Sequence, residues 1–489
     1  MSEPIREACG VFAIAGNEEA SHLTYLGLYA LQHRGQESAG IVTAEGEHPH
    51  AHLGMGLVAD VFSEEVLNQL KGNRAIGHVR YSTTGSSNIL NAQPILCEYR
   101  RGWVAVAHNG NLINTLELRG KLESEGSIFR TATDSEILIH LLARSPQLDF
   151  LDALEECLAK LRGAFSMVIM NDQYTIGLRD PLGIRPLSLG KLGDAYIFCS
   201  ETSALDIIGA EYLRTVEPGE MVIITKNRIE SRFYYKQDIA DIRRKQAQCI
   251  FELVYFARPD SYVYGRLVQP ARENLGRVLA RECPTEADVV IPIPDSSISS
   301  AIGYALESKI PYQQGIIRSH YIGRTFIEPS QSIRDFGCKI KYNPVRSVLE
   351  GKRIIVVDDS IVRGTTMRKI VKMIRKAGAK EIHLRIASPV WMEPCYYGID
   401  TPERGRLIGA THTLEEIQKH LRVDSLRYLS IEGLLQAVGG TEEEFCTACF
   451  SGKYPIRWSG QALEPLSKKE VEAEKLLVHV EEEPVENPT

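Results

Sequence analysis

The chain has 489 residues, more than one hydrophobic core usually organises, so two or three domains are expected. Its net charge of −7 gives no general attraction to nucleic acids or membranes, and no apolar run approaches the roughly 18 residues that a membrane span needs. Ten cysteines with no secretory signal predict a cytoplasmic protein, in which cysteine serves cores, catalysis or metal binding more often than disulfides.

The first stretch, "MSEPIREACGVFAIAG", places a short charged leader before Cys9. A lipoprotein anchor or signal peptide is excluded, because the leader contains Glu3 and Glu7 and has no apolar region. Two interpretations of this stretch stay open. Cys9 is either a buried cysteine at the start of the first strand or a nucleophile.

The segment up to about residue 240 alternates short apolar runs with helical patterns. "RAIGHVRYST", "GWVAVAHNG" and "AFSMVIM" are typical of strands, whereas the spacing of apolar residues predicts helices over 19–33 and 134–143. We therefore expect an α+β domain of layered sheets and helices.

A polar, charged stretch at 238–248, "DIADIRRKQAQ", marks the expected domain boundary. Beyond it, "ADVVIPIP" and "KRIIVVDDS" are strand patterns that each precede a helical pattern. This order predicts a doubly wound α/β domain with a parallel sheet. From about residue 461 the chain becomes acidic and contains prolines, which predicts a disordered tail.

The most specific local signal is "IIVVDDSIVRGTT" at 354–366, in which an apolar strand ends at Asp358 and Asp359. The turn that follows contains Ser360, Arg363, Gly364, Thr365 and Thr366. Backbone N–H groups at a helix start bind phosphate, and paired carboxylates accept hydrogen bonds from sugar hydroxyls or help to hold Mg²⁺. An ordinary acidic turn is the competing interpretation, but the whole string favours a phosphorylated sugar. A Walker A loop is excluded because Gly-Lys-Ser/Thr is missing.

A second strand end, "IPIPDSS", contains Asp295, Ser296 and Ser297 and should open on the same sheet edge. The segment between the two loops, 319–347, carries several basic residues, among them Arg324. It is either a plain surface loop or, as we favour, a mobile cationic lid over a departing pyrophosphate.

Four N-terminal strings, "CGVF", "LQHRGQESAGI", "GHVRYSTTG" and "AHNGNL", closely resemble the glutaminase domain of N-terminal-nucleophile (Ntn) amidotransferases. The string at 354–366 closely resembles the signature of phosphoribosyltransferases that bind phosphoribosyl pyrophosphate (PRPP). Together they resemble the glutamine phosphoribosylpyrophosphate amidotransferase family, from Cys9 to about Trp458.

The resemblance implies an enzyme that hydrolyses glutamine and passes the ammonia internally to PRPP. The products would be glutamate, 5-phosphoribosylamine and pyrophosphate, in the first step of de novo purine synthesis. It also implies a propeptide at 1–8, an Ntn-type α/β/β/α glutaminase domain at 9–240 and a phosphoribosyltransferase domain at 241–460, followed by the tail at 461–489.

The resemblance further assigns roles to residues. Cys9 is the nucleophile, and its own α-amino group is the base once the propeptide is removed, because that group titrates near pH 7.7–8.0. Asn109 and Gly110 stabilise the oxyanion, while Arg80 and Asp134 bind the α-carboxylate and α-ammonium of glutamine. The implied PRPP-binding residues are Asp358, Asp359, Ser360, Arg363, Gly364, Thr365, Thr366, Asp295, Ser297 and Arg324, with Mg²⁺ held by Ser296, Asp358 and Asp359.

The C-x-x-C pair Cys446 and Cys449 suits a metal or cluster, although a redox pair or chance would also explain it. The resemblance adds Cys249 and Cys395, matching the four ligands of the [4Fe–4S] branch of the family, which also carries a propeptide. Cys97, Cys157, Cys199 and Cys283 are expected to be core or neutral residues.

Two other functions are weighed against this one: a PRPP-sensing regulator without chemistry, and another glutamine-dependent sugar-phosphate amidotransferase. The intact glutaminase set opposes the first, and the phosphoribosyl string opposes the second. Relatives of this family also imply feedback by purine nucleotides and a homotetramer, with no nucleic-acid or membrane partner.

Overall fold

The computed structural model describes residues 9–81, 88–226, 228–235, 246–319, 342–401 and 403–456. The predicted propeptide, most of the boundary stretch at 238–248, Arg324 with the rest of 320–341, and the acidic tail lie outside the described residues. No helix within the described ranges is long and apolar enough to cross a membrane.

Two antiparallel sheets form the first half of the molecule. The seven-stranded sheet has the order β11-β9-β10-β1-β4-β2-β3, and the six-stranded sheet has the order β13-β12-β8-β7-β6-β5. The first contains β1 (Gly10–Ala15), β2 (Ser38–Glu45), β3 (His48–Met55), β4 (Arg74–Arg80), β9 (Ser188–Leu192), β10 (Ala195–Cys199) and β11 (Glu211–Thr215). The second contains β5 (Ile95–Tyr99), β6 (Gly102–Leu112), β7 (Gly163–Asn171), β8 (Thr175–Arg179), β12 (Glu220–Ile224) and β13 (Ile229–Phe233).

Helices cover the outer faces of these two sheets. Beside the first sheet lie α1 (Ala20–Ala30), α2 (Val58–Val61), α3 (Glu64–Gln69), α7 (Ser203–Ile207) and the short turn η1 (Gln32–Arg34). On the side of the second sheet are α4 (Thr115–Ser124), α5 (Glu136–Arg144) and α6 (Phe150–Leu158), while the turn η2 (Ile89–Asn91) precedes β5. The predicted helix over 19–33 is therefore shorter, because the chain tightens into η1 after Ala30.

β1 is buried on both faces, which explains its continuous apolar sequence. Val11 and Ala13 belong to the core between the sheets, whereas Phe12 and Ile14 pack under α1. Gly27 lets α1 approach the sheet, since a Cβ there would lie 2.3 Å from the Phe12 ring. Burying such large side chains contributes roughly 1.5–3 kcal/mol each, so this packing fixes the position of β1.

The second half is built on a parallel four-stranded sheet of order β17-β20-β21-β22. These strands are β17 (Val289–Pro292), β20 (Arg353–Asp358), β21 (Glu381–Ile386) and β22 (Ser425–Tyr428). The longer helices are α9 (Val268–Glu282), α10 (Ile298–Ser308), α13 (Thr365–Lys376), α15 (Leu414–Leu421) and α16 (Ile431–Val438).

Short elements complete this half. The helices among them are the π-helix η3 (Glu252–Phe256), α12 (Arg346–Leu349), η4 (Arg404–Arg406), α14 (Ile408–Thr411) and α17 (Ala448–Ser451). The strand pairs are β14 (Gln248–Cys249) with β23 (Phe445–Cys446), β15 (Tyr262–Val263) with β16 (Arg266–Leu267), and β18 (Ile316–Arg318) with β19 (Tyr342–Pro344).

α13 shows how the local sequence produces the second half. Met367, Ile370, Val371 and Ile374 form its buried face, while Lys and Arg residues occupy the other face. The chain leaves the helix at Gly378, whose φ of +95° favours glycine. α13 thus packs its apolar face on the sheet directly after the phosphate-loop sequence.

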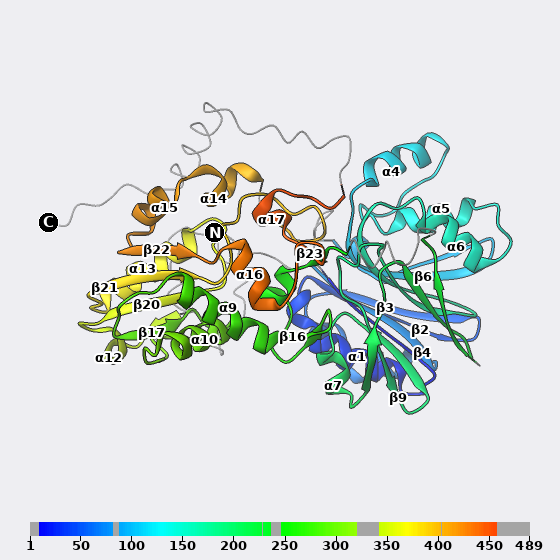
Figure 1. Cartoon of the computed structure of the whole chain (residues 1–489). Coiled ribbons are helices and arrows are strands. Elements are labelled where there is room, and N and C mark those ends of the chain that lie inside the picture. The colour runs from blue at the N-terminus through cyan, green and yellow to red at the C-terminus, as the bar shows by residue number, and fades with distance from the viewer. Residues whose placement is uncertain are drawn as a thin grey trace.

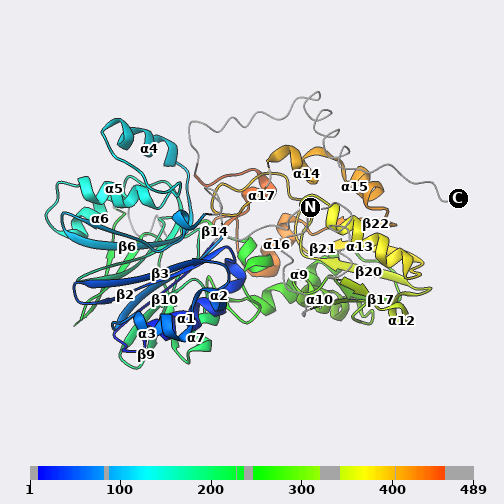
Figure 2. The ribbon, with the colours of Figure 1, turned by 180° about the vertical axis from the view of Figure 1, so that it is seen from behind.

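The two halves lie side by side, with β14, α16 and α17 between the sandwich and the parallel sheet (Figures 1 and 2). The predicted fold class is confirmed in both parts: a layered α/β/β/α domain followed by a parallel α/β domain.

Candidate active sites

Cys9 lies at the start of β1, beside the end of β4. Its thiol donates a hydrogen bond to the Tyr81 carbonyl at 3.5 Å, and the register pairs Gly10 with Val79. The Cys9 side chain is buried, although the residue keeps 7% of its surface exposed. Sheet pairing therefore places the predicted nucleophile next to the strand that ends at Arg80.

The Cys9 thiol needs a base before it can attack an amide. Burial raises the pKa of this thiol, outweighing the Tyr81 hydrogen bond and the Arg80 charge, which act in the opposite direction. No histidine ring in the described ranges is hydrogen-bonded to the thiol. The α-amino group of Cys9 as the base stays a prediction.

Asn109 and Gly110 lie in β6 and come close to β1 through Ser200. The Asn109 amide donates to the Ser200 hydroxyl at 3.4 Å, and that hydroxyl accepts the Val11 N–H at 3.0 Å. The side-chain oxygen of Asn109, Oδ1, is buried without a hydrogen-bond partner among the described residues. Gly110 has φ of +145°, and a Cβ there would lie 2.0 Å from the Ala164 carbonyl oxygen, so the strand requires glycine at this position.

Arg80 and Asp134 provide opposite charges near Cys9. Arg80 is almost fully buried, with its Nη1 3.6 Å from a Glu37 oxygen. Asp134 accepts the Leu112 N–H at 2.8 Å and lies 3.4 Å from Nδ1 of His108.

Burial raises the pKa of Asp134, but the His108 charge and these hydrogen bonds outweigh burial and leave the pKa below its usual value. Asp134 is therefore held as a carboxylate. The five predicted glutaminase residues are gathered around the N-terminal end of strand β1.

The acid pair Asp358 and Asp359 stands at the carboxyl end of β20. Ser297 donates to Asp358 at 2.9 Å, Ser360 donates to Asp359 at 2.7 Å, and Ser296 also donates to Asp359. The two predicted strand-end loops therefore converge, as the parallel sheet requires.

Asp295 lies in the same loop but is exposed and paired with Arg318 at 2.5 Å. Arg324 lies outside the described residues, so its predicted role stays a prediction.

A cleft of about 160 Å³ lies over the acid pair. Its lining includes Ser296, Asp358, Asp359, Ser360, Arg363, Gly364, Thr365 and Thr366. Gly364, with φ of +76°, is the N-cap residue directly before α13, and the buried Thr365 hydroxyl has no hydrogen-bond partner among the described residues. A phosphate at this helix start would meet backbone N–H groups and that hydroxyl.

The chemistry of the acid pair fits Mg²⁺. Burial, and then the neighbouring Asp359 charge, raise the pKa of Asp358 well above its usual range, and burial also raises the pKa of Asp359. Two close carboxylates that repel each other in a buried place are stabilised by a divalent cation. Their oxygens and the Ser296 hydroxyl are the hard donors that Mg²⁺ prefers.

The four predicted cluster cysteines approach one another from distant parts of the chain. Cys249 pairs with Cys446 across β14 and β23, and the charges of Cys249 and Cys395 act on Cys446. Cys446, Cys249 and Cys395 in turn act on Cys449. Burial raises the pKa of each of the four thiols, for Cys249 to about 12.

A buried cation lies beside these thiols. The guanidinium of Arg185 forms an ion pair with Glu252 at 3.0 Å, and its charge lowers the pKa of Cys249 and Cys395 against the effect of burial. The described residues contain no group of three or more His, Cys, Asp or Glu side chains that could hold a metal ion. The [4Fe–4S] ligand set therefore stays a prediction.

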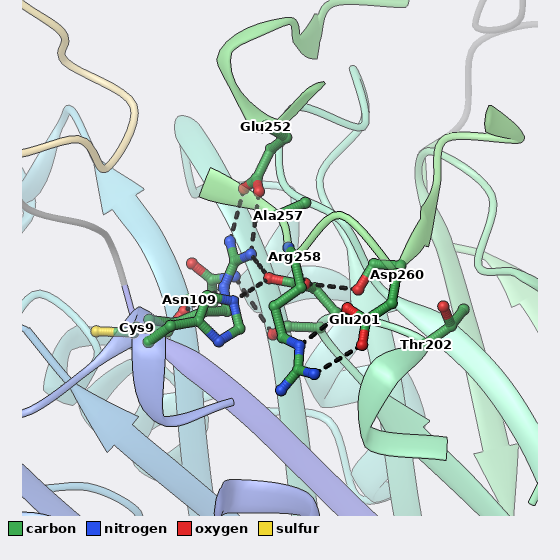
Figure 3. A network of polar contacts seen from close by, with 12 residues as sticks. Cys9, Asn109, Glu201, Thr202, Glu252, Ala257, Arg258 and Asp260 are labelled. Carbon is green, nitrogen blue, oxygen red and sulfur yellow. Dashed lines mark hydrogen bonds and ion pairs between the residues drawn. The ribbon is translucent and has the colours of Figure 1, made fainter. Parts of the chain in front are cut away.

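The sequence interpretation missed a buried ionic network between the two halves (Figure 3). Arg34 and Glu201 of the sandwich and Glu252 of η3 are each fully buried and joined by ion pairs. Arg34 lies in the quoted string "LQHRGQESAGI", but its role was not assigned. The available signal was Glu252 itself, an acid inside the apolar run "CIFELVYF", because a buried carboxylate needs a partner.

A larger hollow of about 850 Å³ lies at the other end of β1, near Ala15 and Arg74. Its lining mixes acidic and basic side chains, and it contains none of the predicted site residues. The chemistry is therefore assigned to the smaller cleft and to the surroundings of Cys9.

Two family models match the chain: a glutamine amidotransferase domain over residues 78–207 and a phosphoribosyl transferase domain over residues 266–388. The chain is 49% identical over 456 residues to "Amidophosphoribosyltransferase" of Bacillus subtilis (strain 168), which covers 92% of this chain and 94% of that protein. It is 51% identical over 457 residues to "Amidophosphoribosyltransferase 1, chloroplastic" of Arabidopsis thaliana, with 93% and 80% covered.

A solved structure is similar over almost the whole chain. It is the glutamine phosphoribosylpyrophosphate (PRPP) amidotransferase from B. subtilis complexed with ADP and GMP. The TM-score is 0.87 at 48% sequence identity, and the match covers 93% of this chain and 99% of that one.

Replacing Asp358 with Asn should stabilise the metal-free protein while lowering PRPP turnover at least about 100-fold, since one charged contact in a site is commonly worth that much. The pKa of Asp358 is higher in the folded state than in the unfolded chain. The free energy of unfolding therefore falls as the pH rises from the unfolded pKa through the folded pKa. The stabilisation should therefore grow between pH 4 and neutral pH, measured by thermal unfolding in EDTA.

The matched control is Asp288→Asn at the opposite end of the same sheet. Hydrogen bonds from Arg353 lower the pKa of Asp288, so this variant should lose stability above the unfolded pKa rather than gain it. A lower melting temperature for Asp358→Asn at every pH would show that repulsion within the acid pair does not destabilise the folded protein.

Proposed function

This chain belongs to the amidophosphoribosyltransferase family, and from its two sites we propose how the residues divide the work. It is a glutamine-dependent enzyme that makes 5-phosphoribosylamine from PRPP, the first step of purine biosynthesis. The observation that carries the proposal is the gathering of Cys9 with Asn109 in one half, and of the acid pair with a phosphate loop in the other.

Glutamine hydrolysis is assigned to the first half. The Cys9 thiolate attacks the amide carbon, and the oxyanion is held by the Asn109 side chain and the Gly110 N–H. Ammonia leaves with the proton taken from the thiol, and water then hydrolyses the thioester to glutamate. Arg80 and Asp134 hold the α-carboxylate and α-ammonium of the substrate, which supplies orientation.

The base is the α-amino group of Cys9. Because burial raises the pKa of the thiol, proton removal needs a nearby group that is neutral at working pH. A free α-amino group titrates at about 7.7–8.0, whereas a peptide nitrogen is not basic. The proposal therefore includes removal of residues 1–8 as a propeptide.

PRPP is assigned to the cleft over the acid pair. Ser360, Arg363, Gly364, Thr365 and Thr366 bind the 5-phosphate, with Asp358 and Asp359 at the ribose hydroxyls. Asp295, Ser296 and Ser297 are assigned to the pyrophosphate, and Arg324 is assigned to it from the sequence resemblance alone. Mg²⁺, held by Ser296, Asp358 and Asp359, would supply charge neutralisation for the pyrophosphate.

Ammonia should pass between the sites inside the protein. Free ammonia is mostly protonated in neutral water, and the protonated form is not a nucleophile. The two halves are in contact next to the proposed oxyanion residues, since the side chain of Asn111 in β6 donates to the Tyr396 carbonyl at 3.0 Å. Direct transfer keeps the ammonia neutral until it reaches carbon 1 of PRPP.

A structural [4Fe–4S] cluster is assigned to Cys249, Cys395, Cys446 and Cys449. The mutual influence of the four thiols, of which Cys249 and Cys449 are buried, and the neighbouring Arg185 guanidinium support this ligand set. The net reaction transfers no electrons, so the cluster would hold together segments that are remote in sequence.

We further propose feedback by purine nucleotides, a homotetramer and a cytoplasmic location. The B. subtilis relative was solved with ADP and GMP, which supports nucleotide binding in this chain as well. The nine cysteines within the described ranges form no disulfide, which suits a reducing compartment.

Cys9→Ala should lower glutamine-dependent product formation at least about a thousandfold, because the nucleophile is lost. Activity with high ammonia should remain, since the second site does not use the thiol. The measurement is PRPP-dependent pyrophosphate release with each nitrogen donor. Loss of both activities in a folded variant would contradict two separate sites.

The mature chain should begin at Cys9. Intact mass and N-terminal sequencing of active enzyme measure this directly, and a variant whose leader is not removed should lack glutaminase activity. Active enzyme that still begins at Met1 or Ser2 would contradict the α-amino base.

Cys446→Ser should lower the iron and sulfide content and the melting temperature of anaerobically purified protein, because the native state would lose a bound cluster. Cys97→Ser is the matched control, since Cys97 lies in β5 away from the four thiols. Active wild-type protein without iron would contradict the proposed cluster. A cluster that survives Cys446→Ser would show that the proposed ligand set is wrong.

A further inference from the structure

The carbonyl group of Cys9 is held by a buried arginine. Nε of Arg34, at the end of η1, donates to the Cys9 carbonyl oxygen at 3.3 Å. Arg34 has no exposed surface, and its guanidinium bonds to Cys9 as well as to the buried carboxylates Glu201 and Glu252. Figure 3 shows Cys9, Glu201 and Glu252 in this network. The backbone of the nucleophile is thus attached to an ionic network.

Glu252 orients this guanidinium with two contacts. Its oxygens accept from Nη1 and Nη2 of Arg34 at 3.0 and 2.6 Å, which is a bidentate pair. Bidentate pairs fix the plane of the guanidinium as well as its position. The direction of the Arg34 Nε–H bond, and hence its aim at Cys9, depends on Glu252.

Glu252 comes from the phosphoribosyltransferase half, which holds it firmly. It begins η3, and Arg272 of α9 donates to the carbonyls of Leu253 and Ala257 at 3.0 and 2.7 Å. Arg272 therefore contacts the backbone near both ends of η3. A side chain of the second half is built rigidly into the nucleophile's surroundings.

We propose that Glu252 is a positioning residue for glutamine hydrolysis, acting through Arg34 on the backbone of Cys9. The thiol and the α-amino group share the Cα of Cys9, so moving its carbonyl changes the direction of both groups. A misplacement of about 1 Å in a reacting group can cost about 100-fold in rate. The inference rests on the proposed nucleophile role of Cys9, which Cys9→Ala tests separately.

The test compares Glu252→Gln with Glu252→Asp in the full-length enzyme. Gln keeps the shape but loses the charge and one acceptor oxygen, whereas Asp keeps the charge with a shorter reach. The kcat and KM for glutamine are measured beside ammonia-dependent synthesis on the same samples, so that the second activity reports whether the protein is folded.

Glu252→Gln should lower the glutamine kcat at least about tenfold with little change in KM, because orientation rather than substrate binding is disturbed. Ammonia-dependent activity should stay, and Glu252→Asp should retain more of the glutamine kcat than Glu252→Gln. An unchanged glutamine kcat would overturn the proposal, as would parallel loss of both activities in the two variants.

Asp260→Asn is the matched control. Asp260 pairs with Arg258 at 2.6 Å near the same interface, and this pair is about half exposed (Figure 3). The backbone N–H of Arg258, which the substitution leaves in place, donates to Glu201 at 2.9 Å. The control should leave both activities unchanged. If it reproduced the glutamine-specific loss, general loosening of the interface would replace positioning as the explanation.

Discussion

The ion pairs of Arg34 with Glu201 and Glu252 constrain the arrangement of everything around them. All three side chains are fully buried, so each charge needs the others to offset the loss of water. Glu201 also accepts hydrogen bonds from the Arg258 N–H and the Ser261 hydroxyl, and Arg185 lies 3.0 Å from Glu252. The two halves must therefore meet in one relative position, because any other would leave a buried charge without a partner.

The elements of the fold were predictable where the spacing of apolar residues within a short segment determines which face is buried. The buried face of α13 and the position of Gly378 were predictable because an amphipathic helix and its end are encoded within a few residues. The layered first half followed from its apolar strand runs. The end of α1 was misplaced because η1, with the sequence Gln-His-Arg, follows the helix almost directly and no Gly or Pro before Gly35 marks the change, although η1 already directs Arg34 toward Cys9.

The candidate site residues were predictable where they follow the end of a strand and lie close together in the sequence. Asp358, Ser296 and Ser297 meet because neighbouring parallel strands end at one sheet edge. Glu252 could not be paired with Arg34 from the sequence, since 218 positions separate them and no local rule joins them. The nearness of the four cysteines likewise depends on tertiary packing, which brings β23 beside β14.

The parallel pairing of β14 with β23 has a consequence for the order of assembly during synthesis. β14 begins the second half, yet its partner strand β23 is made almost 200 residues later, close to the end of the described ranges. The Cys249 N–H also donates to the Ile184 carbonyl of the sandwich at 3.1 Å. This junction therefore joins three segments that are far apart in the sequence: the sandwich, β14 and β23. The junction between the halves can close only when translation is nearly complete, and until then Arg34 and Arg185 lack a fixed counter-charge from η3.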